Sequence, residues 1–202
     1  PNPKPQTPNP KPQTPFILLF IMLSSSFQRK QIMPAVGEHV EDKYTFKETL
    51  GAGRFGTVFK AICKQTDEPV AIKFVSAKDI NYHVNLRNEI MTEISALTAV
   101  NHPNVVKLID CFENQQGIYV VMEYCEGGTL SKHVRKQKGL GEEISLRFLK
   151  QLLDGYKIML EAGIVHRDIK PDNILLKGDR IVMADFGFAK FLEENEIGRA
   201  HV

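Results

Sequence analysis

The spacing of apolar residues changes along the 202-residue chain and predicts its secondary structure. From Tyr44 to about residue 123, short apolar runs alternate with glycine and charged residues, a pattern typical of β-strands. Val84–Val100 and Glu142–Ala162 instead repeat apolar residues every three or four positions, so both are predicted to be amphipathic helices. The predicted strands are Tyr44–Leu50, Thr57–Lys64, Pro69–Val75, Val106–Glu113, Gly117–Glu123 and the short Ile174–Leu176. The pattern predicts an α+β protein in which one helix interrupts a series of strands and mostly helix follows.

The first 43 residues show neither pattern, and we expect them to form a disordered or non-native extension. Residues 1–15 repeat the unit PNPKPQT, a proline-rich composition that cannot build a core. The nucleotide unit CCCCAAA, read in triplets, encodes this repeat and resembles telomeric DNA, so we expect these residues to be non-coding sequence read through. The apolar run Phe16–Leu23 is too short for a bilayer span of about 20 residues, and Met33 is the expected start.

Composition narrows the class of protein. Hydrophobic residues make up 43% and charged residues 25%, the balance of a globular chain. The formal net charge of +2 argues against nucleic acid as a partner, because nucleic-acid binding needs a basic excess on one face. The three cysteines, Cys63, Cys111 and Cys125, form no C-x-x-C, which excludes a disulfide scaffold and disfavours structural zinc. Reduced thiols favour a cytoplasmic location, and we expect no membrane partner.

A glycine-rich segment joins the first two predicted strands. Leu50–Val58 has the form G-x-G-x-x-G-x-V, in which glycines let backbone N–H groups approach a phosphate closely. A plain hairpin turn is the simplest alternative. A dinucleotide-binding fold shares the first six positions but leads into a helix, whereas strand-like residues follow here, which disfavours that fold.

Lys73 stands in an apolar strand and needs a counter-charge. Burying an unpaired ammonium is costly, so a carboxylate on the following helix is expected to face it. Glu89 and Glu93 lie four residues apart and therefore on one helix face. We favour Glu93, because it precedes the His102-Pro-Asn sequence by nine residues, the usual spacing when a helix glutamate pairs with a strand lysine.

The strongest chemical signal is His166–Asn173, followed twelve residues later by the Asp185-Phe-Gly sequence. Asp168 can accept the proton of an attacking hydroxyl, and Lys170 can reach a transferred phosphoryl group. Asn173 and Asp185 offer oxygen atoms, which hard cations such as Mg²⁺ prefer.

These blocks, in this order, resemble the signature set of the eukaryotic protein kinases from about Tyr44 to Leu192. The resemblance implies a bilobal α+β fold, with a five-stranded N-lobe carrying one helix at 44–124 and a partial C-lobe at 125–194. A lysine at position 170, two residues after Asp168, resembles the pattern of serine/threonine kinases rather than that of tyrosine kinases. The sequence around Asp185 is similar to the calcium/calmodulin-dependent and Unc-51-like groups.

The resemblance also implies a role for each site residue. ATP and Mg²⁺ would be the ligands, with a protein serine or threonine hydroxyl as acceptor. Asp168 would be the catalytic base, and Leu97, Leu108, His166 and Phe186 would stack as a column joining the lobes. The implied catalytic residues are Asp168, Lys170 and Asn173; the metal ligands Asn173 and Asp185; the glycine loop Leu50, Gly51, Ala52, Gly53, Arg54, Phe55, Gly56, Thr57 and Val58; and the other nucleotide-binding residues Ala71, Lys73, Glu93, Met122 as gatekeeper, Glu123 and Cys125 as hinge, and Leu175.

The sequence departs from the family pattern near the hinge and at the end. Thr129 stands where many kinases have an acidic residue against the ribose, so a hydroxyl contact must substitute. No A-P-E motif follows Gly187, and we expect the C-lobe to be truncated. Ile197–Val202 resembles a translated sequencing adapter, so 195–202 is expected to be an artefactual tail. We interpret Lys132–Lys138 as a solvated helix face.

These departures leave two functions open. The motifs predict an ATP-dependent serine/threonine kinase. The alternative is a nucleotide-binding or regulatory fragment without catalysis, because the activation segment and later helices are missing.

Overall fold

The computed structural model describes residues 35–36, 39–53 and 56–192, with side chains from residue 39 onward. The proline repeat, the Phe16–Leu23 run, Met33 and the predicted tail at 195–202 lie outside the described residues. Among those that are described, no helix has both the length and the apolar character needed to cross a membrane.

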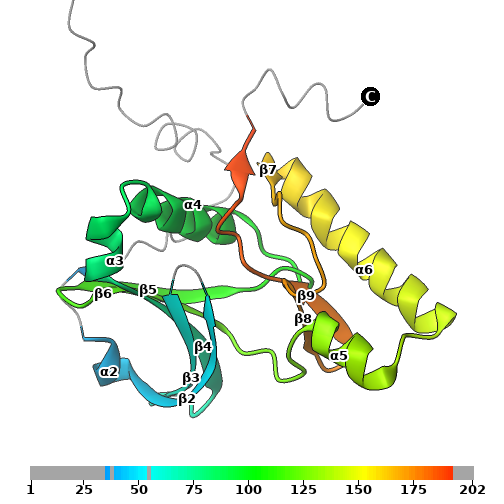
Figure 1. Cartoon of the computed structure of the whole chain (residues 1–202), viewed down its shortest axis with the longest axis horizontal. Helices are drawn as coiled ribbons and strands as arrows, with labels where there is room; N and C mark the ends of the chain where they lie inside the picture. Colours follow the sequence, from blue (N-terminus) through cyan, green and yellow to red (C-terminus); the bar gives the residue numbers. More distant parts are fainter. Residues whose placement is uncertain (1–34, 37–38, 54–55, 193–202) are drawn as a thin grey trace, which may run out of the picture. The chain divides into compact units, whose positions relative to one another are not determined.

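A twisted sheet forms the N-lobe and confirms the five predicted antiparallel strands (Figure 1). The strands are β2 (Tyr44–Gly53), β3 (Gly56–Cys63), β4 (Pro69–Ser76), β5 (Leu108–Asn114) and β6 (Gly117–Glu123). Their spatial order is β5-β6-β4-β3-β2. The two-residue strand β1 (Ala35–Val36) adds to the outer edge by pairing in parallel with β5, so the sheet has a sixth strand.

The N-lobe helix α4 (Leu86–Ala99) matches the prediction, but the lobe carries two further short helices. They are α2 (Val40–Lys43) and α3 (Ala77–Tyr82). The prediction of one helix omitted them because four or six residues are too few to show a helical repeat. The N-cap of α3 is Ser76, whose hydroxyl accepts a hydrogen bond from the Asp79 N–H. Both β1 and α2 fall within the stretch expected to be an extension, so secondary structure begins before Tyr44.

The described part of the C-lobe is built on two helices and two small strand pairs. The helices are α5 (Leu130–Gln137) and α6 (Glu142–Glu161). The strands β8 (Ile174–Lys177) and β9 (Arg180–Met183) form an antiparallel hairpin against α6, and β7 (Ile164–Val165) pairs with β10 (Lys190–Phe191). The predicted strand at Val106 begins two residues late, because the Val106 N–H bonds to Met183 of β9 instead of to β6.

One buried cluster runs through both lobes. It joins Leu97 of α4 and Leu108 of β5 to Met159 of α6 and Phe186 after β9, each at most 5% exposed. Burial of such side chains contributes about 1.5–3 kcal/mol each. The cluster therefore fixes how the sheet and the helical lobe meet.

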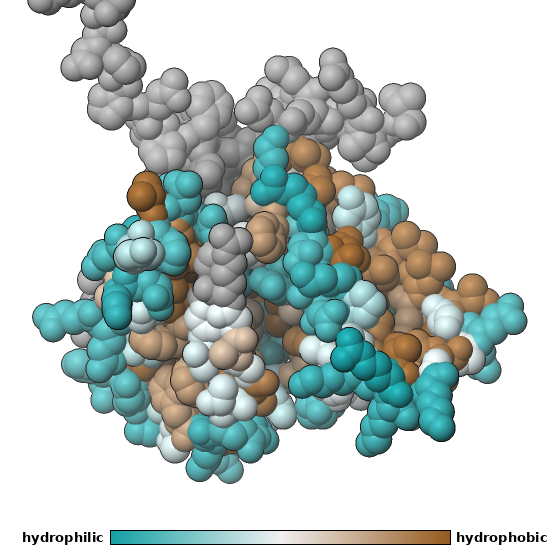
Figure 2. All heavy atoms as spheres, in the orientation of Figure 1, coloured by the Kyte–Doolittle hydropathy of each residue, from teal (hydrophilic) through white to brown (hydrophobic). Residues whose placement is uncertain are grey.

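The remaining side of α6 is apolar and exposed. Leu146, Leu149 and Leu153 are each more than half exposed, and Figure 2 shows the hydrophobic surface over α6 at the right.

Gly117 offers a test of the sheet. Its φ of +152° disfavours other residues, and an added Cβ would lie 2.1 Å from the Val75 carbonyl oxygen. We expect Gly117→Ala to lower the free energy of unfolding by about 1–3 kcal/mol. Chemical denaturation measures the change. Gly141→Ala is the matched control, because nothing lies within 4 Å of its added Cβ. An equal loss of stability in both variants would contradict the conclusion that Gly117 is required at the start of β6.

Candidate active site

A cleft of about 570 Å³ lies between the glycine-rich hairpin, the segment after β6 and the loops around β8 and β9. Most of the predicted site residues line it, although they come from separate parts of the chain. Those lining the cleft are Leu50, Gly51, Gly53, Gly56, Val58, Ala71, Lys73, Glu93, Met122, Glu123, Cys125, Asp168, Lys170, Asn173, Leu175 and Asp185. Ala52 and Thr57 are paired in the β2–β3 hairpin without lining the cleft. Arg54 and Phe55 lie outside the described residues.

The glycine-rich segment is a strand–turn–strand hairpin. Gly51 pairs with Val58 and Gly53 with Gly56, and the chain continues directly into β3. A dinucleotide-binding fold would lead into a helix at this point, so that alternative is excluded. Gly56 has a φ of +135°, and an added Cβ would lie 2.2 Å from the Phe74 carbonyl oxygen, which explains the need for glycine.

Lys73 is held by two carboxylates. Its Nζ lies 2.6 Å from Glu93 Oε2 on α4 and 3.9 Å from Asp185 Oδ1. Burial alone would lower the pKa of Lys73, but the Glu93 carboxylate, joined by Asp185, outweighs burial and raises the pKa. Lys73 therefore stays charged inside the cleft. Glu93, not Glu89, is the partner, as the spacing to His102 predicted.

Asp168 is oriented by two neighbours in its own loop. Its Oδ2 accepts hydrogen bonds from Lys170 Nζ and from Asn173 Nδ2, each 2.7 Å long. The hydrogen bond from the Lys170 ammonium, supported by Asn173 and opposed by burial, holds the pKa of the Asp168 carboxyl below its ordinary value. Asp168 is thus an ionised acceptor in a fixed orientation.

Packing behind the catalytic loop positions it against the core. The His166 and Phe186 rings lie 4.7 Å apart between centroids, and His166 Nε2 is 3.0 Å from the Ala184 carbonyl oxygen. Both side chains are almost fully buried, as are Leu97 and Leu108. The four residues expected to form a column between the lobes thus all lie in the interior.

Asn173 and Asp185 fit a magnesium ion by their chemistry. The Asn173 hydrogen bonds come from Nδ2, which leaves Oδ1 available as an oxygen ligand. Asp185 has a φ of +63° and its side chain is 47% exposed, at the cleft. Within the described residues no group of three or more His, Cys, Asp or Glu side chains forms a ready-made metal site. Two protein oxygens suit Mg²⁺, which usually takes its remaining ligands from water and phosphate.

The inner part of the cleft is apolar. Val58, Ala71 and Met122 lie on the neighbouring strands β3, β4 and β6, and Leu175 of β8 contributes from the other lobe. Burial raises the pKa of the Cys125 thiol to about 12, so this thiol stays protonated. The surface suits a flat aromatic ring.

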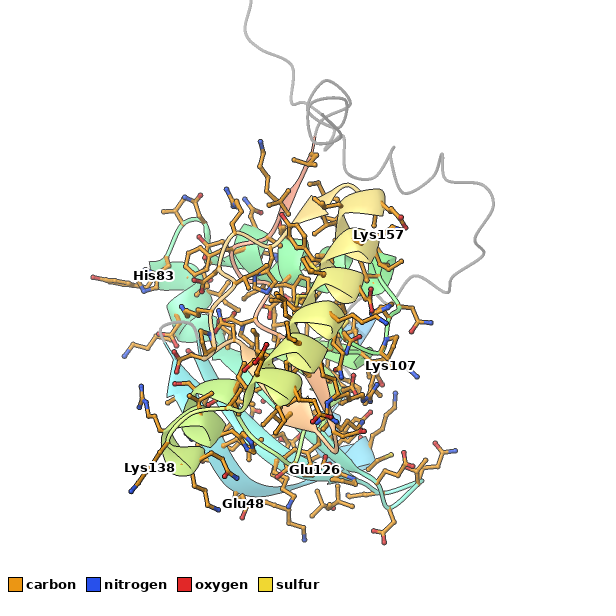
Figure 3. The ribbon with its side chains drawn as sticks, turned by 90° about the vertical axis from the view of Figure 1, so that its right-hand side faces the viewer. Glu48, His83, Lys107, Glu126, Lys138 and Lys157 are labelled. Carbon is orange, nitrogen blue, oxygen red and sulfur yellow. The ribbon has the colours of Figure 1, made fainter. Side chains whose placement is uncertain are left out.

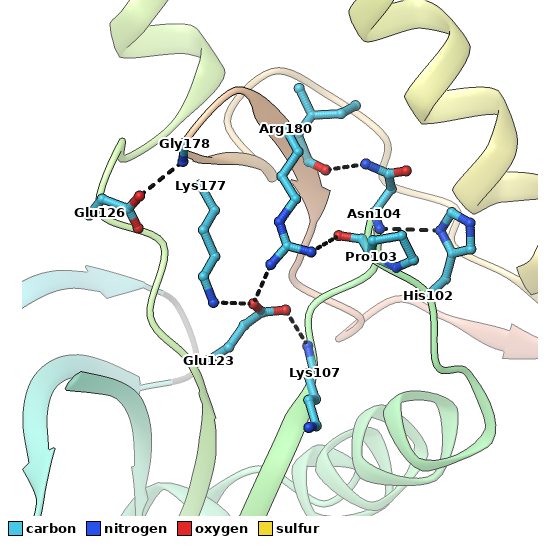
Figure 4. A network of polar contacts seen from close by, with 10 residues as sticks. His102, Pro103, Asn104, Lys107, Glu123, Glu126, Lys177, Gly178 and Arg180 are labelled. Atoms are coloured by element: carbon cyan, nitrogen blue, oxygen red, sulfur yellow. Dashed lines mark hydrogen bonds and ion pairs between the residues drawn. The ribbon is translucent and has the colours of Figure 1, made fainter. Parts of the chain in front are cut away.

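The Glu123 side chain belongs to a network of polar contacts that no sequence pattern indicated (Figure 4). The side chain is only 11% exposed, and its Oε2 lies 2.6 Å from Lys177 Nζ and 3.2 Å from Arg180 Nη2. Oε1 accepts the Lys107 N–H at 3.0 Å, and Arg180 also donates to the Pro103 carbonyl. Glu123 thus ties β6 to the β8–β9 hairpin, a contact between residues 54 and 57 positions apart that no local motif records.

Several further residues line the cleft, and of these only Thr129 had been predicted to contact a ligand. Lys132 and Asp172 bring charge to it, and Thr129 begins α5 with its hydroxyl accepting the Lys132 N–H. A ribose contact by Thr129 stays a prediction. The others are Val106, Tyr124, Glu126, Gly128, Ala184, Gly187 and Phe188.

The geometry brings an ammonium, an oriented carboxylate and oxygen ligands together in one cleft with an apolar inner wall. The protein kinase domain model matches residues 44–201. The chain belongs to the protein kinase family, and the relatives described below are serine/threonine-protein kinases.

Curated relatives place the chain near the Unc-51-like group. It is 39% identical over 169 residues to serine/threonine-protein kinase atg1 of Dictyostelium discoideum, covering 80% of this chain and 25% of that protein. It is 37% identical over 163 residues to human serine/threonine-protein kinase ULK3, covering 79% and 34%. For serine/threonine-protein kinase unc-51 of Caenorhabditis elegans the identity is 35% over 164 residues, covering 75% and 19%. The chain thus spans between 19% and 34% of the length of these three relatives.

Glu123→Gln tests the tie between β6 and the hairpin. The amide keeps the shape but loses the charge facing Lys177 and Arg180, so we expect the free energy of unfolding to fall by about 1–2 kcal/mol. Chemical denaturation measures it. Glu161→Gln is the matched control, because the Lys157–Glu161 pair is exposed and 3.9 Å long. Equal stability of Glu123→Gln and the wild type would contradict a stabilising role for the network.

Lys170→Ala tests the electrostatics of Asp168. Because Lys170 lowers the pKa of Asp168, its removal should raise that pKa towards the ordinary carboxyl value. The carboxyl ¹³C shift of Asp168, followed by NMR during a pH titration, measures this directly. The acid limb of any Asp168-dependent activity should move to higher pH in parallel. An unchanged titration midpoint would show that Lys170 does not hold this carboxylate.

Proposed function

We propose that this chain binds Mg-ATP and transfers the γ-phosphoryl group to a serine or threonine hydroxyl of a protein. The observation that carries the proposal is the convergence of Lys73, Asp168 and Asp185 on one cleft with an apolar inner wall. Family membership and the serine/threonine-type relatives support it. The three free cysteines favour a cytoplasmic location.

Each charged residue has one task in this mechanism. Lys73 would hold the α- and β-phosphates, and Glu93 keeps its ammonium in position. Asn173 and Asp185 would hold Mg²⁺, which when bound screens the charge of the phosphates.

The oriented Asp168 carboxylate faces the acceptor. It accepts the hydroxyl proton as the new oxygen–phosphorus bond forms and the bond from the γ-phosphorus to the β–γ bridging oxygen breaks. Lys170, beside it, lies where it can neutralise charge on the transferred group. The protein contributes position and charge rather than covalent chemistry.

A second function is favoured by the exposed apolar side of α6. Leu146, Leu149 and Leu153 are open to solvent, and an exposed apolar surface of this kind marks an interaction site. The alternative is therefore a regulatory fragment that binds nucleotide and a partner through this surface without catalysing transfer. Nucleotide binding without phosphotransfer is the result that distinguishes this function from the first.

Two substitutions test the main proposal. Lys73→Met removes the charge facing the phosphates and should abolish both phosphotransfer and the thermal shift produced by Mg-ATP. Asp168→Asn should keep that thermal shift but lower turnover by about 10²–10⁴-fold, because only the base is lost. The assays are phosphotransfer to a serine-containing peptide and Mg-ATP thermal shift. Near-normal turnover in Asp168→Asn would overturn the assignment of the base.

A further inference from the structure

Helix α5 presents a face made only of cations. Lys132, Arg135 and Lys136 are exposed and lie three and four residues apart, so they share one side of the helix. We call these three residues the α5 basic face. Figure 2 shows hydrophilic side chains gathered over α5, and Figure 3 shows Lys138 at the C-terminal end of the same helix.

Within the part of the chain that the structure describes, the α5 basic face has no carboxylate counter-charge. Across residues 39–53 and 56–192, none of its three cations lies within 4.0 Å of a carboxylate, whereas Arg87 and Lys177 each bind a glutamate at 2.6 Å. Like charges spaced three and four residues apart repel each other, and a bound anion relieves this repulsion. The face is thus prepared for an acidic ligand.

The position of α5 links this face to the reaction centre. The Ser131 N–H donates to the Pro171 carbonyl oxygen at 3.0 Å, which fastens the start of α5 to the catalytic loop. Lys132 lines the same cleft as Asp168 and Lys170. A ligand lying along the α5 basic face would therefore reach the acceptor position beside Asp168.

We propose that the α5 basic face docks an acidic segment of the protein substrate, next to the serine or threonine that is phosphorylated. This inference rests on the proposed function and adds a substrate class to it. Asp172 and Glu126 also line the cleft, but Glu126 is engaged by the Gly178 N–H, and neither pairs with the α5 cations. Three cations beside a catalytic cleft suit a peptide better than a nucleic acid, which needs a longer basic track.

Peptide binding tests the proposal without requiring turnover. The probes are two fluorescein-labelled serine peptides, one with aspartate and glutamate around the serine and one with asparagine and glutamine there. We expect the full chain to bind the acidic peptide on the order of tenfold more tightly, from three exposed charge pairs. In the triple variant Lys132→Gln, Arg135→Gln, Lys136→Gln this ratio should fall to about one, by fluorescence anisotropy.

A matched triple variant removes the same charge elsewhere. Lys47→Gln, Lys78→Gln, Lys150→Gln changes three exposed lysines on β2, α3 and α6, and should keep the preference for the acidic peptide. A ratio near one in the wild type, or equal loss in both triple variants, would overturn the proposal. So would tighter binding of a labelled oligonucleotide than of the acidic peptide through the same three residues. Mg-ATP thermal shift on the same samples reports the proposed function separately, so the two can fail independently.

Discussion

The ion pair between Lys73 and Glu93 is the interaction on which the cleft depends. It joins the middle of the sheet to α4, and both side chains are buried, with only 15% and 3% exposed. Losing one partner of such a pair leaves a buried charge uncompensated, at a cost of about 3–5 kcal/mol. The pair therefore constrains α4 to lie against the sheet, and with α4 in place Leu97 packs into the cluster that contains Phe186.

Phe186 connects this constraint to the chemistry. Its ring packs against His166 at an interplanar angle of 54°, and its chain neighbour Asp185 lies 3.9 Å from Lys73 Nζ. His166 in turn accepts the Asp168 N–H at its Nδ1 atom. The Lys73 ammonium, Asp185 and the Asp168 carboxylate are thus positioned by one continuous arrangement of packed and hydrogen-bonded groups.

Elements with a strong local signal were predictable from the sequence. Five strands and the two long helices follow from their periodicity, and Lys73, Asp168 and Asp185 follow from motif spacing. Elements of two to six residues, such as α3 and β1, carry too few residues for a periodic signal. The Glu123 network escaped because its partners Lys177 and Arg180 are brought near only by the tertiary fold, and no residue pattern near Glu123 encodes them.

The same network bears on how the polypeptide could be dissected. Glu123 is the last residue of the sheet, yet its cationic partners come from beyond the hinge, and one apolar interior is shared by both halves. Cutting the chain at the hinge would leave the Glu123 carboxylate without its cations and would expose the interior side chains to water. We therefore expect the two halves to unfold together in a single cooperative transition.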